Sequence, residues 1–160
     1  MTHTTTARQR VHIRWMIRRD MAEVLAIENA SFDYPWPEEQ FLRVLKQRNC
    51  IGMVAECGER ITGFMVYELH RNRIDVLNFA VAPTDRNEGI GSQMVAKLIG
   101  KLATQRRNRI THTIRERNLA GQLFLRSQGF LATKLVREHF ADTGEDAYSM
   151  VYGLDLATIA

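Results

Sequence analysis

The stretch Arg86-Asn87-Glu88-Gly89-Ile90-Gly91-Ser92 stands between two different apolar patterns. Before it, the run Val76–Val81 predicts a buried strand that is closed by Pro83. After it, apolar residues recur at helical spacing, at Ile90, Met94, Val95, Leu98, Ile99 and Leu102. The chain is therefore expected to pass from a strand, through a glycine-containing loop, into a helix.

The two glycines make this loop a candidate anion site. Gly89 and Gly91 can take backbone angles closed to other residues, and they let a ligand approach the main chain. The N–H groups and the dipole of the following helix favour an anion such as a pyrophosphate. The loop has neither the Gly-Lys-Ser/Thr of a Walker loop nor the GxGxxG dinucleotide fingerprint. By spacing alone, phosphate binding competes with a plain helix start whose glycines only ease the turn.

Length and composition indicate one globular domain. The 160 residues are 45% hydrophobic, which is enough for a real core. The net charge of +4 is a mild basic excess that favours acidic or phosphorylated partners without demanding nucleic acid. The basic run Arg106–Arg109 has no interleaved aromatic residue, which favours a solvated helix end over a nucleic-acid surface. Direct nucleic-acid binding is therefore not expected.

The cysteines and the N-terminus indicate the compartment. Cys50 and Cys57 are the only cysteines, and their spacing fits neither a CxxC pair nor a zinc site. Two thiols in a domain of this size favour a reduced compartment, so neither a disulfide nor a metal requirement is expected. Residues 1–10 lack the apolar segment of a signal peptide, and no stretch is long enough to cross a membrane. The expectation is a flexible tail before a cytoplasmic domain, monomeric or weakly dimeric, without membrane contact.

The rest of the chain alternates strand and helix patterns in a single series. Strand patterns cover residues 11–17, 51–56, 61–69, 76–81, 109–115, 130–137 and 148–156. Helical patterns cover residues 21–32, 37–45, 90–102 and 119–124. Asp20 with Glu23 predicts a capping box, Asn118 predicts a helix N-cap, and Gly129 predicts a helix end. The turn 142–146 is expected to join the last two strands.

The order of these elements and three groups of residues resemble the GCN5-related N-acetyltransferase (GNAT) superfamily. The residues that carry the resemblance are Arg86-x-x-Gly89-x-Gly91, Asn118 with Ala120, and Gly129-Phe130. The resemblance covers residues 11 to about 155. It implies a single α/β (α+β) domain over residues 11–156, with a mixed, mostly antiparallel seven-stranded sheet and four flanking helices.

Within the superfamily, three segments are most similar to the RimI-like protein N-terminal acetyltransferases. Phe32–Trp36 resembles their Phe-x-x-Pro-Trp segment between the first two helices. Asn78–Val81 resembles their central strand, and Glu145–Met150 resembles their last strand. The resemblance implies direct transfer in a ternary complex to the N-terminal α-amine of a protein, with a ribosomal protein as one candidate.

The resemblance also implies acetyl-coenzyme A as the donor. Main-chain groups of Phe79 and Val81, with Ala80 between them, would hold the pantetheine arm and the thioester carbonyl. The pyrophosphate would be held by N–H groups of Arg86, Asn87, Glu88, Gly89, Ile90, Gly91 and Ser92. Asn118 would contact the pantetheine side.

The acceptor would enter between two segments. One is the loop Tyr34-Pro35-Trp36, and the other is the hairpin around His139 and Phe140. Tyr34 and Trp36 are also compatible with hydrophobic packing over the junction of the first two helices. His139 is either a substitute base near the entrance or part of an ordinary hairpin surface.

The chain departs from the family pattern where proton transfer is usually assigned. Leu125 stands where RimI-like enzymes usually have the tyrosine that acts as general acid. Thr113 stands where RimI has the glutamate that acts as general base. His139 and Phe140 replace the paired tyrosines of the closing hairpin.

Three residues remain candidates for proton transfer. Asp75, early on the central strand, would act through water, with a surface charge as the alternative. His112 has a suitable intrinsic pKa, but alternation places it with Ile110 and Ile114, which favours a buried core histidine unless a bulge shifts the register. Tyr148 is the best surviving hydroxyl near the expected site and is equally compatible with packing.

A site without a strong general base favours an acceptor amine that loses its proton easily. An α-amine has a pKa of roughly 7.7–8.0, against about 10.4 for a lysine, so far more of it is neutral at pH 7. Three functional classes remain open: a protein N-terminal acetyltransferase, an acetyltransferase of a small amine or polyamine, and a non-catalytic acyl-coenzyme A binder.

Overall fold

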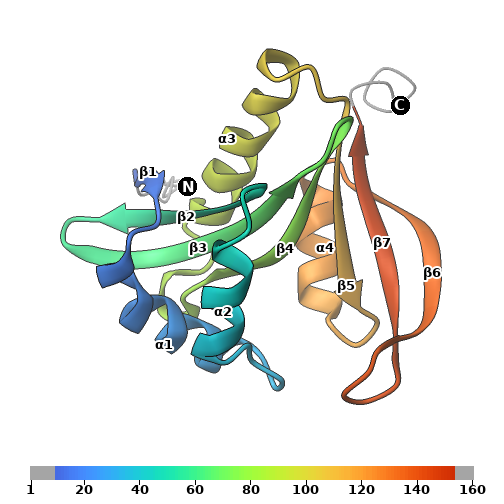
Figure 1. Cartoon of the computed structure of the whole chain (residues 1–160), viewed down its shortest axis with the longest axis horizontal. Helices are drawn as coiled ribbons and strands as arrows, with labels where there is room; N and C mark the ends of the chain where they lie inside the picture. Colours follow the sequence, from blue (N-terminus) through green and yellow to red (C-terminus); the bar gives the residue numbers. More distant parts are fainter. Residues whose placement is uncertain (1–9, 154–160) are drawn as a thin grey trace, which may run out of the picture. The chain divides into compact units, whose positions relative to one another are not determined.

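The computed structural model describes residues 10–153 of the chain. The predicted flexible tail, residues 1–10, falls almost wholly outside the described residues. The elements follow the expected order of strand, two helices, three strands, helix, strand, helix and two strands (Figure 1). The strands are β1 (His12–Trp15), β2 (Cys50–Cys57), β3 (Arg60–Leu69), β4 (Arg73–Val81), β5 (Arg109–Arg115), β6 (Leu131–Phe140) and β7 (Glu145–Gly153). The helices are α1 (Met21–Ser31), α2 (Glu38–Leu45), α3 (Ile90–Thr104) and α4 (Leu119–Ser127).

The strands form one mixed sheet in the order β1-β2-β3-β4-β5-β7-β6. The pairs β1/β2, β5/β7 and β6/β7 are antiparallel, and β4/β5 is parallel. A parallel pair needs a crossover connection, and α3 supplies it between β4 and β5. The predicted mixed, mostly antiparallel seven-stranded sheet with four helices is confirmed.

The chain divides into two compact units. The first runs to Tyr67 and includes Asn78–Lys97, and the second comprises Glu68–Leu77 and the chain from Leu98 onward. Side chains that form the core of the first unit include Val24, Ile27, Phe41, Val54, Phe64 and Val66. Side chains that form the core of the second include Ile74, Leu98, Leu102, Ile110, Phe130 and Ala147. The single domain expected over residues 11–156 stays a prediction.

The predicted capping box at the start of α1 is wrong. The Asp20 carboxylate accepts hydrogen bonds from Nη1 and Nη2 of Arg14, at 2.8 and 2.9 Å, and from the Ile17 N–H at 2.8 Å. Glu23 accepts a hydrogen bond from the Ile61 N–H at 2.8 Å. A bidentate, charge-assisted pair is stronger than a bond to a helix N–H, so Asp20 turns toward β1 instead of capping the helix.

The other predicted helix ends and the last turn are present, and the boundaries of the turn differ by a few residues from those predicted. The Asn118 side chain accepts a hydrogen bond from the Gly121 N–H at 3.0 Å and caps α4 as predicted. Gly129 follows α4 with a φ of +94°, a left-handed conformation that suits glycine after a helix. The last hairpin is tighter than expected, because Glu145 and Asp146 belong to β7 and the turn is confined to residues 141–144.

No helix in residues 10–153 is long and apolar enough to span a membrane. Cys50 and Cys57 are both in the reduced form.

Candidate functional site

The loop before α3 has the geometry that the sequence predicts. β4 ends at Val81, a short 3-10 turn covers Pro83–Asp85, and α3 begins at Ile90. Asn87 and Gly89 both have positive φ, at 65° and 82°. The first helical bond runs from the Gln93 N–H to the Gly89 carbonyl at 3.1 Å, so the N-terminus of α3 opens onto this loop.

The two glycines play different parts in the loop. Gly89 requires its left-handed backbone angle, but Gly91 lies within α3 and has no positive φ. Gly91 therefore makes no use of the backbone angles that only a glycine takes readily. What remains of the argument for Gly91 is its missing side chain, which leaves the first helical turn open to a ligand.

Charged side chains fix the start of the loop within the first unit. Arg86 donates from Nε to the Val81 carbonyl and from Nη2 to the Ser31 hydroxyl, both at 3.1 Å. Asp85, only 4% exposed, accepts bonds of 2.7 and 2.9 Å from the guanidinium of Arg60. Sequence reasoning missed the Arg60–Asp85 pair, since the two residues lie 25 positions apart.

A buried carboxylate connects two other predicted segments in the same unit. Glu28 of α1 is 1% exposed. Its Oε1 accepts from the Trp36 N–H at 3.0 Å, and its Oε2 accepts from Nδ2 of Asn78 at 2.9 Å. Burial raises the pKa of Glu28, and the two hydrogen bonds oppose that rise. The carboxylate thereby joins the loop Tyr34–Trp36 to the strand segment that begins Asn78–Phe79.

Sequence reasoning missed Glu28, although a signal was present. Glu28 lies on the mostly apolar side of α1, where a charged residue has to find a partner or remain exposed. Only the packing of α1 against β4 identifies Asn78 as that partner.

The aromatic residues of the candidate acceptor loop differ in exposure. The Trp36 ring packs edge-on against Phe41 of α2, with ring centroids 5.2 Å apart, and Phe41 packs in the same way against Phe64 at 5.6 Å. Tyr34 is 53% exposed. The packing alternative therefore holds for Trp36, whereas the Tyr34 side chain faces solvent. Pro35 stands between them with intermediate exposure.

The candidate bases Asp75 and His112 lie on neighbouring rungs of the β4–β5 ladder in the second unit. Asp75 pairs with Thr111, and Val76 pairs with His112. Oδ1 of Asp75 accepts from the Thr111 hydroxyl at 3.0 Å, and burial raises the pKa of this carboxyl. Asp75 is thus a half-buried, hydrogen-bonded group and not a plain surface charge.

His112 has a defined tautomer. Its Nδ1 lies 2.8 Å from the Val76 carbonyl oxygen. Since a carbonyl can only accept, Nδ1 carries the proton and Nε2 carries the lone pair of the neutral ring. Burial lowers the pKa of His112 to about 4, so the ring is neutral at pH 7. The exposure of His112 is intermediate, so the structure contains a half-buried, hydrogen-bonded histidine on the strand face that also carries the buried Ile110 and Ile114.

The remaining candidates of the second unit lie on α4 and β7. Leu125 of α4 is 3% exposed, so this position is filled by an apolar side chain. Tyr148 of β7 is half-buried and pairs with Ile114 on one side and with Leu135 on the other. Thr113, at the family's glutamate position, pairs with Ser149.

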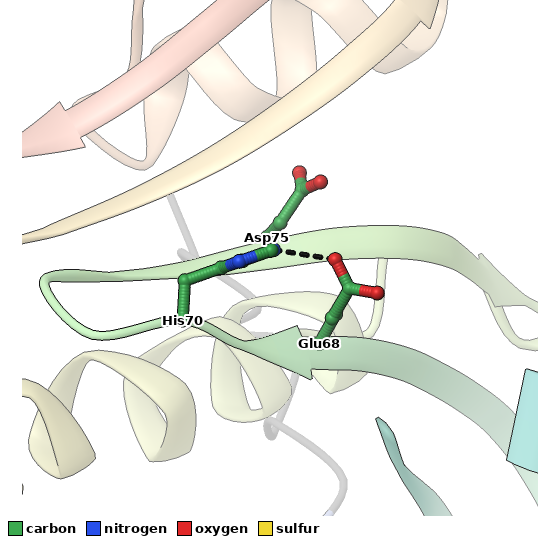
Figure 2. A group of neighbouring side chains, drawn as sticks. All are labelled: Glu68, His70 and Asp75. Atoms are coloured by element: carbon green, nitrogen blue, oxygen red, sulfur yellow. Dashed lines mark ion pairs between the residues drawn. The ribbon is translucent and has the colours of Figure 1, made fainter. Parts of the chain in front are cut away.

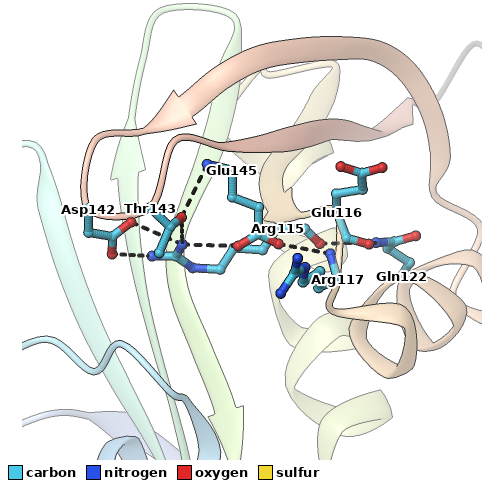
Figure 3. Close-up of polar contacts among 7 residues, drawn as sticks. All are labelled: Arg115, Glu116, Arg117, Gln122, Asp142, Thr143 and Glu145. Carbon is cyan, nitrogen blue, oxygen red and sulfur yellow. Dashed lines mark hydrogen bonds and ion pairs between the residues drawn. The ribbon is translucent and has the colours of Figure 1, made fainter.

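The β6–β7 turn is held by one arginine that sequence reasoning missed (Figure 3). Arg115 donates to Asp142 at 2.7 and 3.2 Å and to Oε1 of Glu145 at 3.2 Å. Its guanidinium carbon also lies 3.9 Å from the ring centre of Phe140, and the His139 ring meets Phe140 edge-on at 4.9 Å. The turn, and with it the end of β6 that carries the candidate acceptor residues His139 and Phe140, is therefore fastened to the end of β5.

The family model for the acetyltransferase (GNAT) family matches residues 21–130. A Bacillus subtilis (strain 168) protein, provisionally named a ribosomal protein bS18-alanine N-acetyltransferase, is 22% identical over 139 residues, which cover 86% of this chain and 92% of that protein. The fold is similar to the crystal structure of the ribosomal-protein-S18-alanine N-acetyltransferase from Escherichia coli, with a TM-score of 0.80 at 20% identity over 91% of this chain and 94% of that one.

A second similar structure is Arabidopsis thaliana NAA60 in complex with acetyl-CoA. It has a TM-score of 0.77 at 13% identity and covers 91% of this chain and 100% of that one. The family model spans most of the chain, and it covers α1, the Gly89 loop and α4. The chain therefore belongs to the acetyltransferase (GNAT) family and is an N-acetyltransferase.

Proposed function

We propose that this protein transfers the acetyl group of acetyl-coenzyme A to the α-amine at the N-terminus of a peptide or protein, with a ribosomal protein as one candidate acceptor. The observation that carries the proposal is the Glu28 contact. It joins Trp36 and Asn78, which belong to two of the segments that resemble N-terminal acetyltransferases. The ribosomal-protein acetyltransferases among the similar proteins support the same acceptor class.

The first unit offers a fitting place for the donor's pyrophosphate. Gly89 and Asn87 turn the backbone so that the N-terminus of α3 opens onto the loop, and Arg86 adds a fixed positive charge. Helix N-termini of this kind favour phosphate groups. We assign the pyrophosphate to the main chain of Arg86–Ser92, and the pantetheine arm to the main chain of Phe79–Val81. When bound, acetyl-coenzyme A supplies the activated acetyl thioester.

The carbonyl of Val81 already accepts the bond from Arg86. The assignment for Val81 therefore rests on its N–H. The roles of Asn118 and Leu125 toward the donor remain predictions from the family resemblance.

The candidate bases favour an acceptor that loses its proton easily. A histidine with a pKa of about 4 is some four units too weak to take a proton efficiently from an α-ammonium group, and it is weaker still against a lysine. The acceptor should therefore enter already neutral. At pH 7 roughly a tenth of an α-amine is neutral, against less than a thousandth of a lysine side chain. Positioning and main-chain hydrogen bonds then supply most of the rate.

A panel of acceptors tests this proposal. Turnover of acetyl-coenzyme A is measured with a peptide that has a free N-terminus, with the same peptide blocked at the N-terminus but carrying a lysine, and with spermidine. The proposal expects the first substrate to have the highest kcat/KM by at least tenfold at pH 7. A preference for the blocked peptide or for spermidine would overturn the acceptor assignment. Tight donor binding without any turnover would indicate a non-catalytic binder.

A further inference from the structure

Three side chains with metal-binding atoms meet at the β3–β4 hairpin of the second unit (Figure 2). Glu68 belongs to the last residues of β3, His70 begins the turn, and Asp75 lies on β4. One ligand atom from each residue lies within 4.8 Å of the other two. Acetyl transfer, as proposed above, gives no role to this group as a whole.

The backbone around His70 is fixed by three hydrogen bonds. The His70 N–H donates to the Arg73 carbonyl at 2.9 Å, which closes the turn. Nε of Arg107 donates to the His70 carbonyl at 2.7 Å, and the Asn108 N–H donates to the Asn72 carbonyl at 3.0 Å. The imidazole therefore projects from a rigid turn, a condition that favours a preformed site.

The inner nitrogen of His70 has an unusual environment. Nε2 is buried and makes no hydrogen bond with any of the described residues. An oxygen of the Glu68 carboxylate nevertheless lies against this nitrogen, drawn as the dashed line in Figure 2. In the tautomer with its proton on Nδ1, the lone pair of Nε2 would face this carboxylate oxygen, and both atoms could bind one cation.

Asp75 supplies the third ligand and a supporting contact. The Thr111 hydroxyl donates to Oδ1 of Asp75 at 3.0 Å and so orients the carboxylate. Two partly buried carboxylates beside one another are stabilised by a positive charge placed between them.

We propose that Glu68, His70 and Asp75 bind a zinc ion. One imidazole nitrogen with two carboxylate oxygens suits Zn²⁺ better than Mg²⁺ or Ca²⁺, which prefer oxygen ligands alone. Bonds of about 2.0–2.2 Å in a tetrahedral arrangement place ligand atoms about 3.3 Å apart. Rotation of the side chains would bring the wider of the present spacings in to this value and move the Glu68 oxygen back from Nε2, and water would take the fourth position.

The ion would fasten the end of β3 to β4 and stabilise the hairpin. A ligand that binds only the folded state stabilises that state. When the ligand is in excess, the gain in the free energy of unfolding grows with the logarithm of the ligand concentration divided by Kd. In this arrangement Asp75 is a metal ligand and not a base for acetyl transfer. The inference stands independently of the acceptor assignment, because its readouts are metal binding and unfolding.

The test uses the untagged full-length chain after treatment with a chelator. Calorimetric titration with zinc chloride should show one ion per chain. Zinc should also raise the Tm in thermal unfolding. Co²⁺ in place of zinc should give a visible absorption band. His70→Asn and Glu68→Gln should each weaken zinc binding at least tenfold. Thr111→Val removes only the supporting hydroxyl and should weaken it about tenfold.

Two controls make the outcome decisive. His12→Asn makes the same substitution at an exposed position on β1 and should leave zinc affinity unchanged. A Cys50→Ser, Cys57→Ser double variant should also bind as the wild type does. Absence of zinc binding to the wild type, equal affinity in His70→Asn, or loss of binding in the cysteine variant would overturn the proposal.

Discussion

Oε2 of Glu28 lies 2.9 Å from Nδ2 of Asn78, and Oε1 of the same carboxylate lies 3.0 Å from the backbone nitrogen of Trp36. Both donors are uncharged, and the carboxylate is 1% exposed. A buried carboxylate without a cation is costly unless its hydrogen bonds are well made. Their geometry should therefore tolerate little change, and through it α1, the Tyr34–Trp36 loop and β4 are held in one arrangement.

Replacing the carboxylate with an amide should break this arrangement. In Glu28→Gln, the new NH₂ group must face either the Trp36 N–H, where two donors meet, or the Asn78 amide, which must then turn its own oxygen toward Gln and give up its present orientation. We expect a loss of about 2–3 kcal/mol in the free energy of unfolding, measured with urea. The KM for a peptide acceptor should also rise.

A second substitution, at Asn78, should again pair a hydrogen-bond donor with an acceptor. Asn78→Asp alone would place two carboxylates together, but combined with Glu28→Gln it gives the amide NH₂ an acceptor again. The double variant should be more stable than the sum of the two single losses predicts, by at least about 1 kcal/mol. Strictly additive losses would show that the 2.9 Å contact contributes little.

Gly91 gives the cleaner test of the donor loop. Gly91→Glu places a charge favourable to the helix dipole in the first turn of α3, so the fold should survive. The same side chain would repel and obstruct a pyrophosphate, and acetyl-coenzyme A binding should fall at least a hundredfold in a titration. Gly89→Glu should also abolish binding, but it adds backbone strain because of the φ of 82°.

Gly100→Glu is the matched control for Gly91→Glu. Gly100 lies further along α3, and a Cβ added there meets nothing within 4 Å. Its substitution should leave donor affinity unchanged. Equal affinity in wild type and Gly91→Glu would contradict the assignment of the pyrophosphate to this loop.

His112 should make stability depend on pH. Its folded pKa of about 4 lies below the ordinary value of 6.5, so the unfolded chain binds a proton more readily. The contribution of the neutral ring is present above about pH 6.5 and is lost as the pH falls toward 4. Between about pH 7 and 5 the wild type should lose roughly 1–2 kcal/mol more than His112→Asn in urea unfolding. Parallel pH profiles for the two proteins would contradict the buried neutral state.

Leu125 tests whether a missing general acid limits the rate. Leu125→Tyr inserts a ring at a position that is 3% exposed, so a stability loss of about 1–3 kcal/mol is expected from overpacking. If protonation of the leaving thiolate limits turnover, kcat should nevertheless rise, with donor affinity nearly unchanged. Leu125→Phe adds the same bulk without the hydroxyl, so an equal rise in both variants would rule out acid catalysis as its cause.

The sequence alone determined the order of elements and the turns between them. The Val76–Val81 run, the glycine loop and the apolar spacing after Ile90 predicted strand, loop and helix. Asn118 and Gly129 marked the two ends of α4. These signals are local, because a helix cap or a left-handed glycine depends on residues within one turn of it.

The tertiary structure decided which polar groups meet. Asp20 accepts a hydrogen bond from Arg14 instead of capping its own helix. Glu28 bonds to Asn78, which is 50 positions away in the sequence. Nδ1 of His112 bonds to the Val76 carbonyl. Each pairing depends on strand register and on how a helix packs against the sheet. Residue periodicity shows which face of an element is buried, but it does not specify which residue of a distant element lies opposite.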